Sequence, residues 1–482
     1  MVNTLLPLAT RLFRKSALMP DLINDFIGLD TEYKLASGST KRRIHLDGAA
    51  SPLVMKTAID ARDALLPHYS NSHSFSHASA HVCSQAHTWA KQTILDTCGA
   101  DEQYSLVSLG NGTTGVMNNI ARRLTKRASE KPIVLVSAME HHANDLPHRE
   151  QTALVNAEVI HIPLVGESAQ QGEIDLVALE ALLKEHPGRV NYVSFSGVSN
   201  VTGIVNPVAE IVALAHQYDA LAVLDAAQSA AHMSLNIAEY DVDFVAFSGH
   251  KVYCAGSPGI LIAKSELLAH YPSDEVGGGV VERVDYDSVD YLNSYPQREQ
   301  AGTKDILGIY SLAKVMAALQ GYGLDKVQAH GVELWQYAAE QLASIQGLVV
   351  YGQTEQTRLG ALSFNIEDVD HGLVAAVLSD YFGIAVRNEC FCAHPYVSSM
   401  VKEALWDLDL DSVPEEQQAA MINRKRGMVR ASFSLYNTRD DVDALCSALR
   451  EIVANKESFE KEYDISELGE YRHKSFVVEF TL

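Results

Sequence analysis

The stretch FVAFSGHK, residues 244–251, decides how the rest of this sequence is interpreted. Its first four residues form a short apolar run typical of a buried strand, and Ser248-Gly249 ends that run with a turn signal. Lys251 follows where the strand leaves the sheet, and a second apolar run, residues 260–263, comes after a glycine- and proline-containing turn. Most lysines in such loops simply reach solvent. A desolvated lysine can instead form a Schiff base, and the small and hydroxylated neighbours of Lys251 favour this second interpretation.

The composition is that of an ordinary globular protein, with 482 residues, 47% hydrophobic and 21% charged. The net charge of −23 argues against a partner made of nucleic acid and against docking on an anionic membrane. The six cysteines form no CxxC pair, which favours reduced thiols and a cytoplasmic location over a zinc ribbon or a disulfide framework. No apolar run is long enough to span a bilayer, and the N-terminal residues match a secretory signal poorly.

Alternating strand and helix patterns predict an α/β domain with a mostly parallel sheet covered by helices. The predicted strands are residues 104–109, 133–136, 157–163, 190–196, 221–224, 244–247 and 260–263, and the helices include residues 82–98, 175–184 and 207–216. A long helical stretch, residues 309–345, with a break near Gly321 and Gly323, leads to a smaller α+β part. That part has predicted strands at 360–366, 384–387 and 427–433, helices at 372–382 and 440–456, and an irregular tail after Tyr463.

Residues 68–81 contain four histidines, His68, His73, His77 and His81. Their spacing permits a metal site. No acidic residue or cysteine is interleaved, however, and no apolar face would hold a helix in place. We therefore interpret the stretch as a polar loop and predict no metal.

Polar residues recur at the carboxyl ends of the predicted strands, where open α/β sheets bind ligands. They are Thr113, His141, Asn200, Asp225, Gln228, His250 and Lys251. Each has an ordinary explanation by itself. Because several strand ends carry polar groups, we expect these residues to converge on one crevice.

The combination of an acid at a strand end, a lysine and a phosphate cradle is what pyridoxal 5′-phosphate (PLP) requires. Asp225 would keep the ring nitrogen protonated, Gln228 could contact the ring hydroxyl group, and His141 could cover the ring face. The glycine-rich turn NGTTG, residues 111–115, precedes a predicted helix and would offer N–H groups to the phosphate.

Three further side chains complete this hypothesis at the two ends of the cofactor. Ser248 and His250 could join Thr113 around the phosphate. Arg430, at a predicted strand start, would suit a substrate carboxylate, although a surface arginine is the ordinary alternative.

Cys392 lies in CFCAHP, residues 390–395. A buried structural cysteine is the usual alternative. The short loop with His394 and Pro395 favours an accessible thiol near a basic group, which could attack an activated sulfur and become a persulfide.

Taken together, these motifs resemble those of the class V aminotransferases of PLP fold type I. The matching motifs are NGTTG, EHHAN (140–144), DAAQ (225–228) and SGHK (248–251). Residues 386–395, VRAS (429–432) and YNT (436–438) are similar to the group II, Suf-type, cysteine desulfurases and selenocysteine lyases. The likeness covers roughly residues 44–452. It implies an N-terminal arm (1–43), a large PLP-binding domain (44–310) and a small domain with the cysteine loop (311–482).

The resemblance also implies roles for individual residues in a PLP-dependent conversion of L-cysteine to L-alanine, with a persulfide on Cys392. The implied catalytic residues are Lys251, Cys392, His141 and Asp225; the implied cofactor contacts are Thr113, Thr114, His141, Asn200, Asp225, Gln228, Ser248, His250, Lys251 and Thr303; Asn200 and Arg430 would contact substrate. Thr303 would reach the partner subunit's phosphate, which implies a homodimer with shared sites. The alternative is another class V reaction, that of a C–S lyase, selenocysteine lyase, epimerase or transaminase, in which Cys392 is not essential.

The chain departs from the family pattern at three places. Glu389 stands where the family has a glycine, and Cys390 makes a C-x-C pair that could protect or resolve a persulfide. The segment between Pro395 and Arg430 is longer than in compact relatives and carries acidic residues at 407, 409, 411, 415 and 416. This insertion could cover the site or receive a sulfur-acceptor protein.

Overall fold

The structure is a computed structural model that describes residues 22–72, 75–273, 275–352, 356–402, 414, 418, 422, 426–466 and 469–478. The acidic residues of the predicted insertion and His73 lie outside the described residues.

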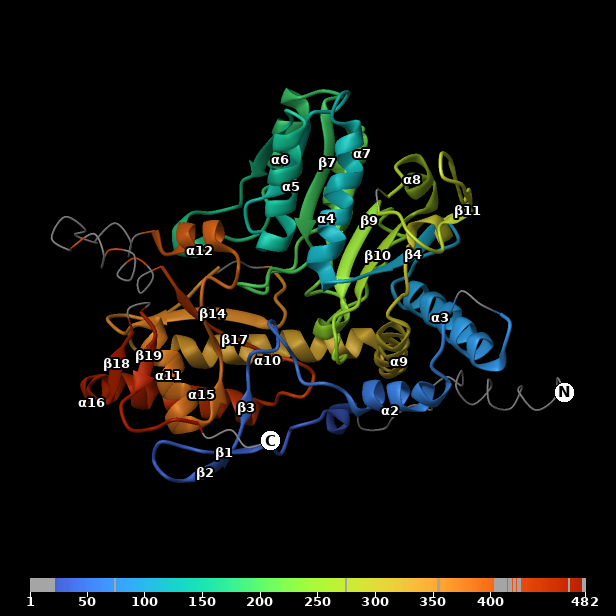
Figure 1. Cartoon of the computed structure of the whole chain (residues 1–482). Coiled ribbons are helices and arrows are strands. Elements are labelled where there is room, and N and C mark those ends of the chain that lie inside the picture. Colours follow the sequence, from blue (N-terminus) through green and yellow to red (C-terminus); the bar gives the residue numbers. More distant parts are fainter. Residues whose placement is uncertain are drawn as a thin grey trace.

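A seven-stranded sheet forms the centre of the larger part of the molecule (Figure 1). Its strand order is β4-β10-β9-β8-β7-β5-β6. The strands are β4 (Tyr104–Leu109), β5 (Ile133–Ser137), β6 (Glu158–Ile162), β7 (Val190–Ser196), β8 (Leu221–Asp225), β9 (Phe244–Ser248) and β10 (Gly259–Lys264). Strand β10 runs antiparallel to both of its neighbours, and the other neighbouring pairs are parallel. The predicted mostly parallel α/β sheet is therefore confirmed.

The apolar run of β9 is explained by burial on both faces of this sheet. Val245 and Phe247 belong to one core cluster, whereas Phe244 and Ala246 belong to another. All four side chains are completely buried. Because successive side chains of a strand point to opposite faces, a doubly covered strand needs apolar residues at every position.

Helices cover both faces (Figure 1). Helix α4 (Gly112–Leu124) packs in the cluster of Phe244. The cluster of Val245 receives apolar side chains from α2 (Lys56–Leu65), α3 (Ala78–Thr97), α6 (Leu176–Glu185), α7 (Val208–Gln217) and α9 (Ile306–Tyr322). The predicted break in the long helical stretch falls at Gly323, with φ of 108°, between α9 and α10 (Leu324–Ala343).

A second, four-stranded sheet has its own core. Its order is β13 (Leu348–Val350), β14 (Ala361–Ile366), β17 (Met428–Ser432) and β16 (Arg387–Glu389). Helices α10, α11 (His371–Phe382) and α15 (Arg439–Ala454) contribute to this core. Strand β3 (Ile44–His45) pairs with β15 (Ile384–Ala385), so the N-terminal segment lies beside the C-terminal part. The domain boundaries after residues 43 and 310 stay a prediction.

The remaining described elements are short. They are β1 (Glu32–Lys34), β2 (Thr40–Arg42), α5 (Leu146–Leu154), α8 (Ser265–His270), β11 (Val281–Val284), β12 (Val289–Tyr291), α12 (His394–Met400), α16 (Lys456–Lys461), β18 (Tyr463–Ile465) and β19 (Tyr471–His473), with short 3₁₀ turns at Leu22–Asp25, Leu66–His68, Thr125–Arg127, His142–Asn144, Ser168–Gln170, Gly249–Lys251 and Gln297–Glu299. Among the described helices, none combines the length and apolarity that a membrane span needs.

The N-terminal arm contains the β1–β2 hairpin, which was not predicted because its residues are all exposed and lack an alternating apolar pattern. Two local predictions were wrong. The tail after Tyr463 forms the β18–β19 hairpin instead of irregular chain. Helix α3 begins at Ala78, inside the predicted histidine loop, because the ring of His77 caps it by accepting the N–H of Ala80 (3.3 Å).

Close packing at Gly259 generates a prediction about stability. A Cβ atom at this position of β10 would lie 2.5 Å from the carbonyl oxygen of Gly112, at the start of α4. We expect Gly259→Ala to lower the free energy of unfolding by about 1–3 kcal/mol, because neither backbone can move freely. Gly110→Ala is the control, since a Cβ there meets nothing within 4 Å. Equal losses in urea unfolding for both variants would contradict this account.

Candidate active site

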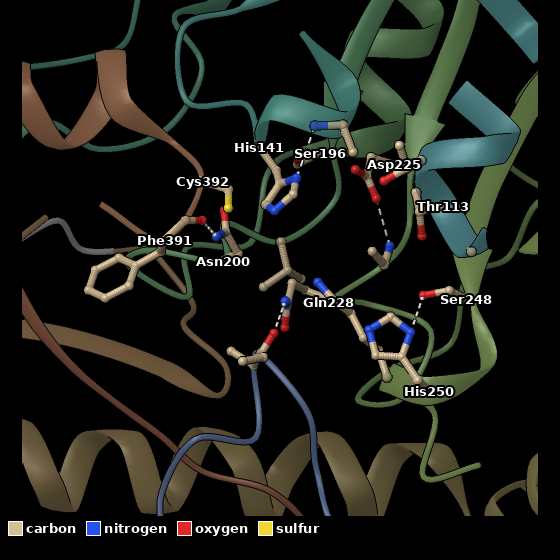
Figure 2. A pocket seen from close by; sticks show the side chains of 18 of the residues that line it. Thr113, His141, Ser196, Asn200, Asp225, Gln228, Ser248, His250, Phe391 and Cys392 are labelled. Atoms are coloured by element: carbon tan, nitrogen blue, oxygen red, sulfur yellow. Dashed lines mark hydrogen bonds between the residues drawn. The ribbon is translucent and has the colours of Figure 1, made fainter. Parts of the chain in front are cut away.

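A cavity of about 300 Å³ opens at the carboxyl ends of the central strands (Figure 2). Every residue predicted for the site lines it except Thr303: Thr113, Thr114, His141, Asn200, Asp225, Gln228, Ser248, His250, Lys251, Cys392 and Arg430. Thr303 is exposed and lies outside the cavity of this chain. The predicted convergence of strand ends on one crevice is thus present in the fold, while the roles of the residues stay predictions.

Lys251 and Asp225 lie at neighbouring strand ends. Lys251 closes the 3₁₀ turn after β9, and Asp225 is the last residue of β8, which pairs with β9. Burial lowers the pKa of the Lys251 ammonium, while the charge of Asp225 opposes that shift. Burial raises the pKa of Asp225. The N–H of Ala227, which donates to its Oδ1 (2.8 Å), and the charge of Lys251 both lower this pKa and so oppose the rise. The result is a desolvated amine close to a buried carboxyl group.

His141 is held as a neutral ring. Its Nδ1 accepts the N–H of Ala143 (3.0 Å), which places the ring proton on Nε2. Burial, followed by the charge of Lys251, lowers its pKa to about 3. Figure 2 shows the ring between Cys392 and Asp225.

The start of α4 offers an anion site at another end of the cavity. Thr113 Oγ1 is buried without a hydrogen-bond partner, although it lines the cavity. Gly112 has φ of 57°, and a Cβ there would lie 2.6 Å from Ser257 Oγ. Helix N-termini with free N–H groups bind phosphate readily, so an unsatisfied hydroxyl at this position fits a phosphate group.

Ser248 and His250 stand beside this anion site. The Nδ1 atom of His250 lies 3.1 Å from Ser248 Oγ and 2.9 Å from Ser257 Oγ (Figure 2 shows the first contact). Burial lowers the pKa of His250 to about 4, so this ring is also neutral. Asn111, from the predicted phosphate turn, and Ser257, which was not predicted, line the cavity too. The turn signals around Ser257 do not distinguish a ligand contact from an ordinary turn.

Arg430 reaches the cavity from β17 of the second sheet. It is 2% exposed, so the alternative of a surface arginine is wrong. Its Nη1 donates to the carbonyl oxygen of Asn200 (2.9 Å), its Nη2 lies 3.2 Å from Asp47 Oδ1, and its guanidinium lies 4.6 Å from the centre of the Phe391 ring. Arg387, opposite Arg430 on β16, also lines the cavity. The sequence predicted no role for Arg387, although it lies within the family-like stretch 386–395.

The loop after β16 presents Cys392, which is exposed and lines the cavity. Asn200 Nδ2 donates to the carbonyl oxygen of Phe391 (2.9 Å). The backbone N–H of His142 donates to the carbonyl oxygen of Cys392 (2.6 Å). Cys390 is buried, its thiol donates to the carbonyl oxygen of Arg426 (2.9 Å), and burial raises its pKa. It faces a separate cavity of about 630 Å³.

Across the described part of the chain, no group of three or more histidine, cysteine, aspartate or glutamate side chains is placed to hold a metal ion. His68, His77 and His81 are among the described residues.

The sequence and the fold of this chain are similar to those of known proteins. A family model described as aminotransferase class V matches residues 44–445. A probable cysteine desulfurase of Halalkalibacterium halodurans is 33% identical over 409 residues, 84% of this chain and 92% of that protein. A cysteine desulfurase of Dickeya dadantii is 31% identical over 410 residues, 85% and 91% of the two chains. The apo structure of a cysteine desulfurase from Thermococcus onnurineus NA1 superposes with a TM-score of 0.75 at 26% identity, covering 86% of this chain and 95% of that one. This chain therefore belongs to the class V aminotransferase family.

Proposed function

We propose that this protein is a PLP-dependent cysteine desulfurase that converts L-cysteine to L-alanine and leaves a persulfide on Cys392. The observation that carries the proposal is one cavity lined by a desolvated lysine, a buried carboxyl group and an exposed thiol. The names of the relatives support the same reaction. The atoms balance without an oxidant, because cysteine and a thiol become alanine and a persulfide.

The residues of the cavity fit PLP. The unpartnered hydroxyl of Thr113 and the start of α4 would hold the phosphate, together with Ser248 and His250. Lys251 would bond to the aldehyde group. When bound, PLP supplies an electron sink that weakens bonds next to the substrate's amino group.

The ring would lie between His141 and the floor of the cavity, with its nitrogen toward Asp225. A neutral imidazole suits this stacking, since a cation there would oppose a protonated ring nitrogen. Gln228 donates one amide N–H to the carbonyl oxygen of Ala49 (2.8 Å) and has a second N–H for the ring hydroxyl group.

Arg430 would bind the substrate carboxylate, because each of its two terminal nitrogens has a second N–H beyond the bonds described above. The thiolate of Cys392 would attack the substrate sulfur. The carbon–sulfur bond breaks, its electron pair stays with carbon, and that carbon takes a proton to become the methyl group of alanine. His141, with its proton on Nε2, is positioned to exchange protons inside the cavity.

A homodimer, a sulfur-acceptor protein and a cytoplasmic location belong to the same proposal. The exposed position of Thr303 supports a contact with a partner subunit, and the free state of all six cysteines suits a reducing compartment.

Replacing the proposed nucleophile tests the reaction itself. We expect Cys392→Ala to abolish formation of alanine and persulfide from cysteine, while the visible absorbance of bound PLP is retained. Cys446→Ala, at a buried thiol far along the chain in α15, is the control. Normal turnover of cysteine by Cys392→Ala, or keto-acid formation without sulfide, would point to another class V reaction.

The backbone of the cysteine loop generates a second prediction. Glu389, Phe391 and Cys392 have φ of 84°, 51° and 55°, in a region that favours glycine. We expect Glu389→Gly to be more stable than Glu389→Ala by about 1 kcal/mol, since both remove the carboxylate and only glycine, which lacks a Cβ atom, relieves the strain. Urea unfolding of the two variants measures the difference. Equal stability would show that the loop carries no such strain.

The proposed dimer leads to a third prediction. Thr303→Val should weaken PLP binding roughly tenfold, by loss of one hydrogen bond to a charged group, while light scattering still reports a dimer of 52.7 kDa chains. Thr40→Val, at an exposed threonine of β2, should leave PLP affinity unchanged. A monomeric wild-type protein with full PLP affinity would refute the shared site.

A further inference from the structure

A second buried carboxyl group lies behind the cavity, and the reaction proposed above gives it no role. Glu140 is 4% exposed and does not line the cavity, although His141 and Ser196 on either side of it do. Ser196 ends β7 directly opposite Asp225 on β8. Neighbouring strands lie ~4.8 Å apart, so Glu140 reaches the Asp225 end of the cavity through a single residue.

Glu140 receives hydrogen bonds from four donors. Ser196 donates its N–H to Oε1 (2.9 Å) and its hydroxyl to Oε2 (2.5 Å), Asn144 Nδ2 donates to Oε2 (2.6 Å), and the hydroxyl of Ser137 donates to Oε1. An ionised carboxylate accepts at all four positions, whereas a protonated one would have to donate to Ser137 or Ser196, whose hydroxyl would then turn to accept. With both hydroxyls donating to it, the arrangement is that of the ionised form.

The carboxylate of Glu140 sets the donor and acceptor directions in a longer series of buried hydrogen bonds. Because Asn144 donates to Glu140 through Nδ2, its Oδ1 must accept, and it does so from Ser194 Oγ (2.7 Å) and His148 Nε2 (3.1 Å). His148 therefore carries its proton on Nε2, and its Nδ1 accepts from the Tyr192 hydroxyl (2.8 Å). Asn144 also ends the 3₁₀ turn that follows His141, so these hydrogen bonds connect that turn to β7.

The charged and titratable groups around Glu140 leave its charge uncompensated. Burial raises its pKa to about 7, against the hydrogen bonds from Ser137, Ser196 and Asn144, and the charge of Asp225 adds to the rise. Burial lowers the pKa of His148 to about 4 and that of His141 to about 3, so neither ring offers a positive charge, and burial raises the pKa of Tyr192. A buried anion without a cation is costly, and its site is beside the carboxylate proposed to face the ring nitrogen.

We propose that Glu140 is a positioning residue of the cofactor site: its carboxylate anchors the turn that follows His141 and adds a second negative charge behind Asp225. The added charge stabilises a protonated ring nitrogen. The inference rests on the proposed PLP chemistry, and it accounts for a buried carboxylate whose ionisation works against folding.

Glu140→Gln tests the proposal because it keeps the size of the side chain and removes the charge. The N–H of Ser196 cannot accept, so the amide nitrogen of glutamine should take the position of Oε2, which faces Asn144. Asn144 then flips, and His148 moves its proton to Nδ1. In the cofactor-free protein, ¹⁵N chemical shifts of His148 should report this change of tautomer. PLP should bind about tenfold more weakly than to wild type, and Glu140→Asp, which retains the charge, should recover part of the affinity.

Stability separates this role from a purely structural one. A carboxyl group with a raised folded-state pKa has its greatest stabilising effect below pH 4.5 and loses it as the pH rises to about 7. Glu140→Gln should therefore gain unfolding free energy relative to wild type over that pH range, while its PLP affinity falls. Glu150→Gln, at an exposed position of α5, is the charge-matched control and should change neither quantity.

Two results would overturn the inference. One is equal PLP affinity of Glu140→Gln and wild type, and the other is loss of stability at pH 8 with an unchanged His148 tautomer. A wild-type protein that does not bind PLP at all would instead refute the proposed function, so the two failures are distinguishable.

Discussion

Burial of the Lys251 amine at the end of β9 is the constraint on which the site depends. A lysine in water is a cation and a poor nucleophile, whereas desolvation favours the neutral amine. Asp225 is the group that opposes this shift most, and it is there because β8 and β9 are neighbours in the sheet. The strand order thus decides how strongly the pKa of the amine is lowered. The two apolar cores around β9 are closely packed, and they hold the buried Lys251 and Asp225 in place.

Two sheets contribute different halves of the site, and Asn200 joins them. The central sheet supplies the lysine, the acid and the anion site, whereas the four-stranded sheet supplies Arg430 and the loop with Cys392. Asn200, shortly after β7, accepts from Arg430 through its carbonyl oxygen and holds the carbonyl of Phe391 through its amide. A shift of either sheet would alter the distance between the thiol and the amine, so these two bonds protect the geometry that sulfur transfer requires.

Most of the fold and much of the cavity could be predicted from the sequence because their signals are local. Strand β9 is apolar at every position because it is buried on both faces, and the polar residue after each such strand must lie at the same edge. Arg387 gave no such signal, since its place in the cavity comes from pairing with Arg430 across two strands that are far apart in sequence. The β1–β2 and β18–β19 hairpins were missed for a related reason, because short exposed strands are defined by their pairing and not by an apolar period.

The C-x-C pair shows how environment separates two identical groups. Only one residue separates Cys390 from Cys392. Cys390 is nevertheless buried, donates a hydrogen bond from its thiol to the carbonyl oxygen of Arg426 and faces a different cavity. Burial favours its neutral thiol over the nucleophilic thiolate. The left-handed backbone at Phe391 and Cys392 turns the loop so that Cys392 alone of the two lines the cavity with Lys251. The backbone of this loop therefore decides which of the two thiols enters the cavity. Glu389 is in a conformation that glycine adopts without strain, so this residue bears directly on the position of the proposed nucleophile, Cys392.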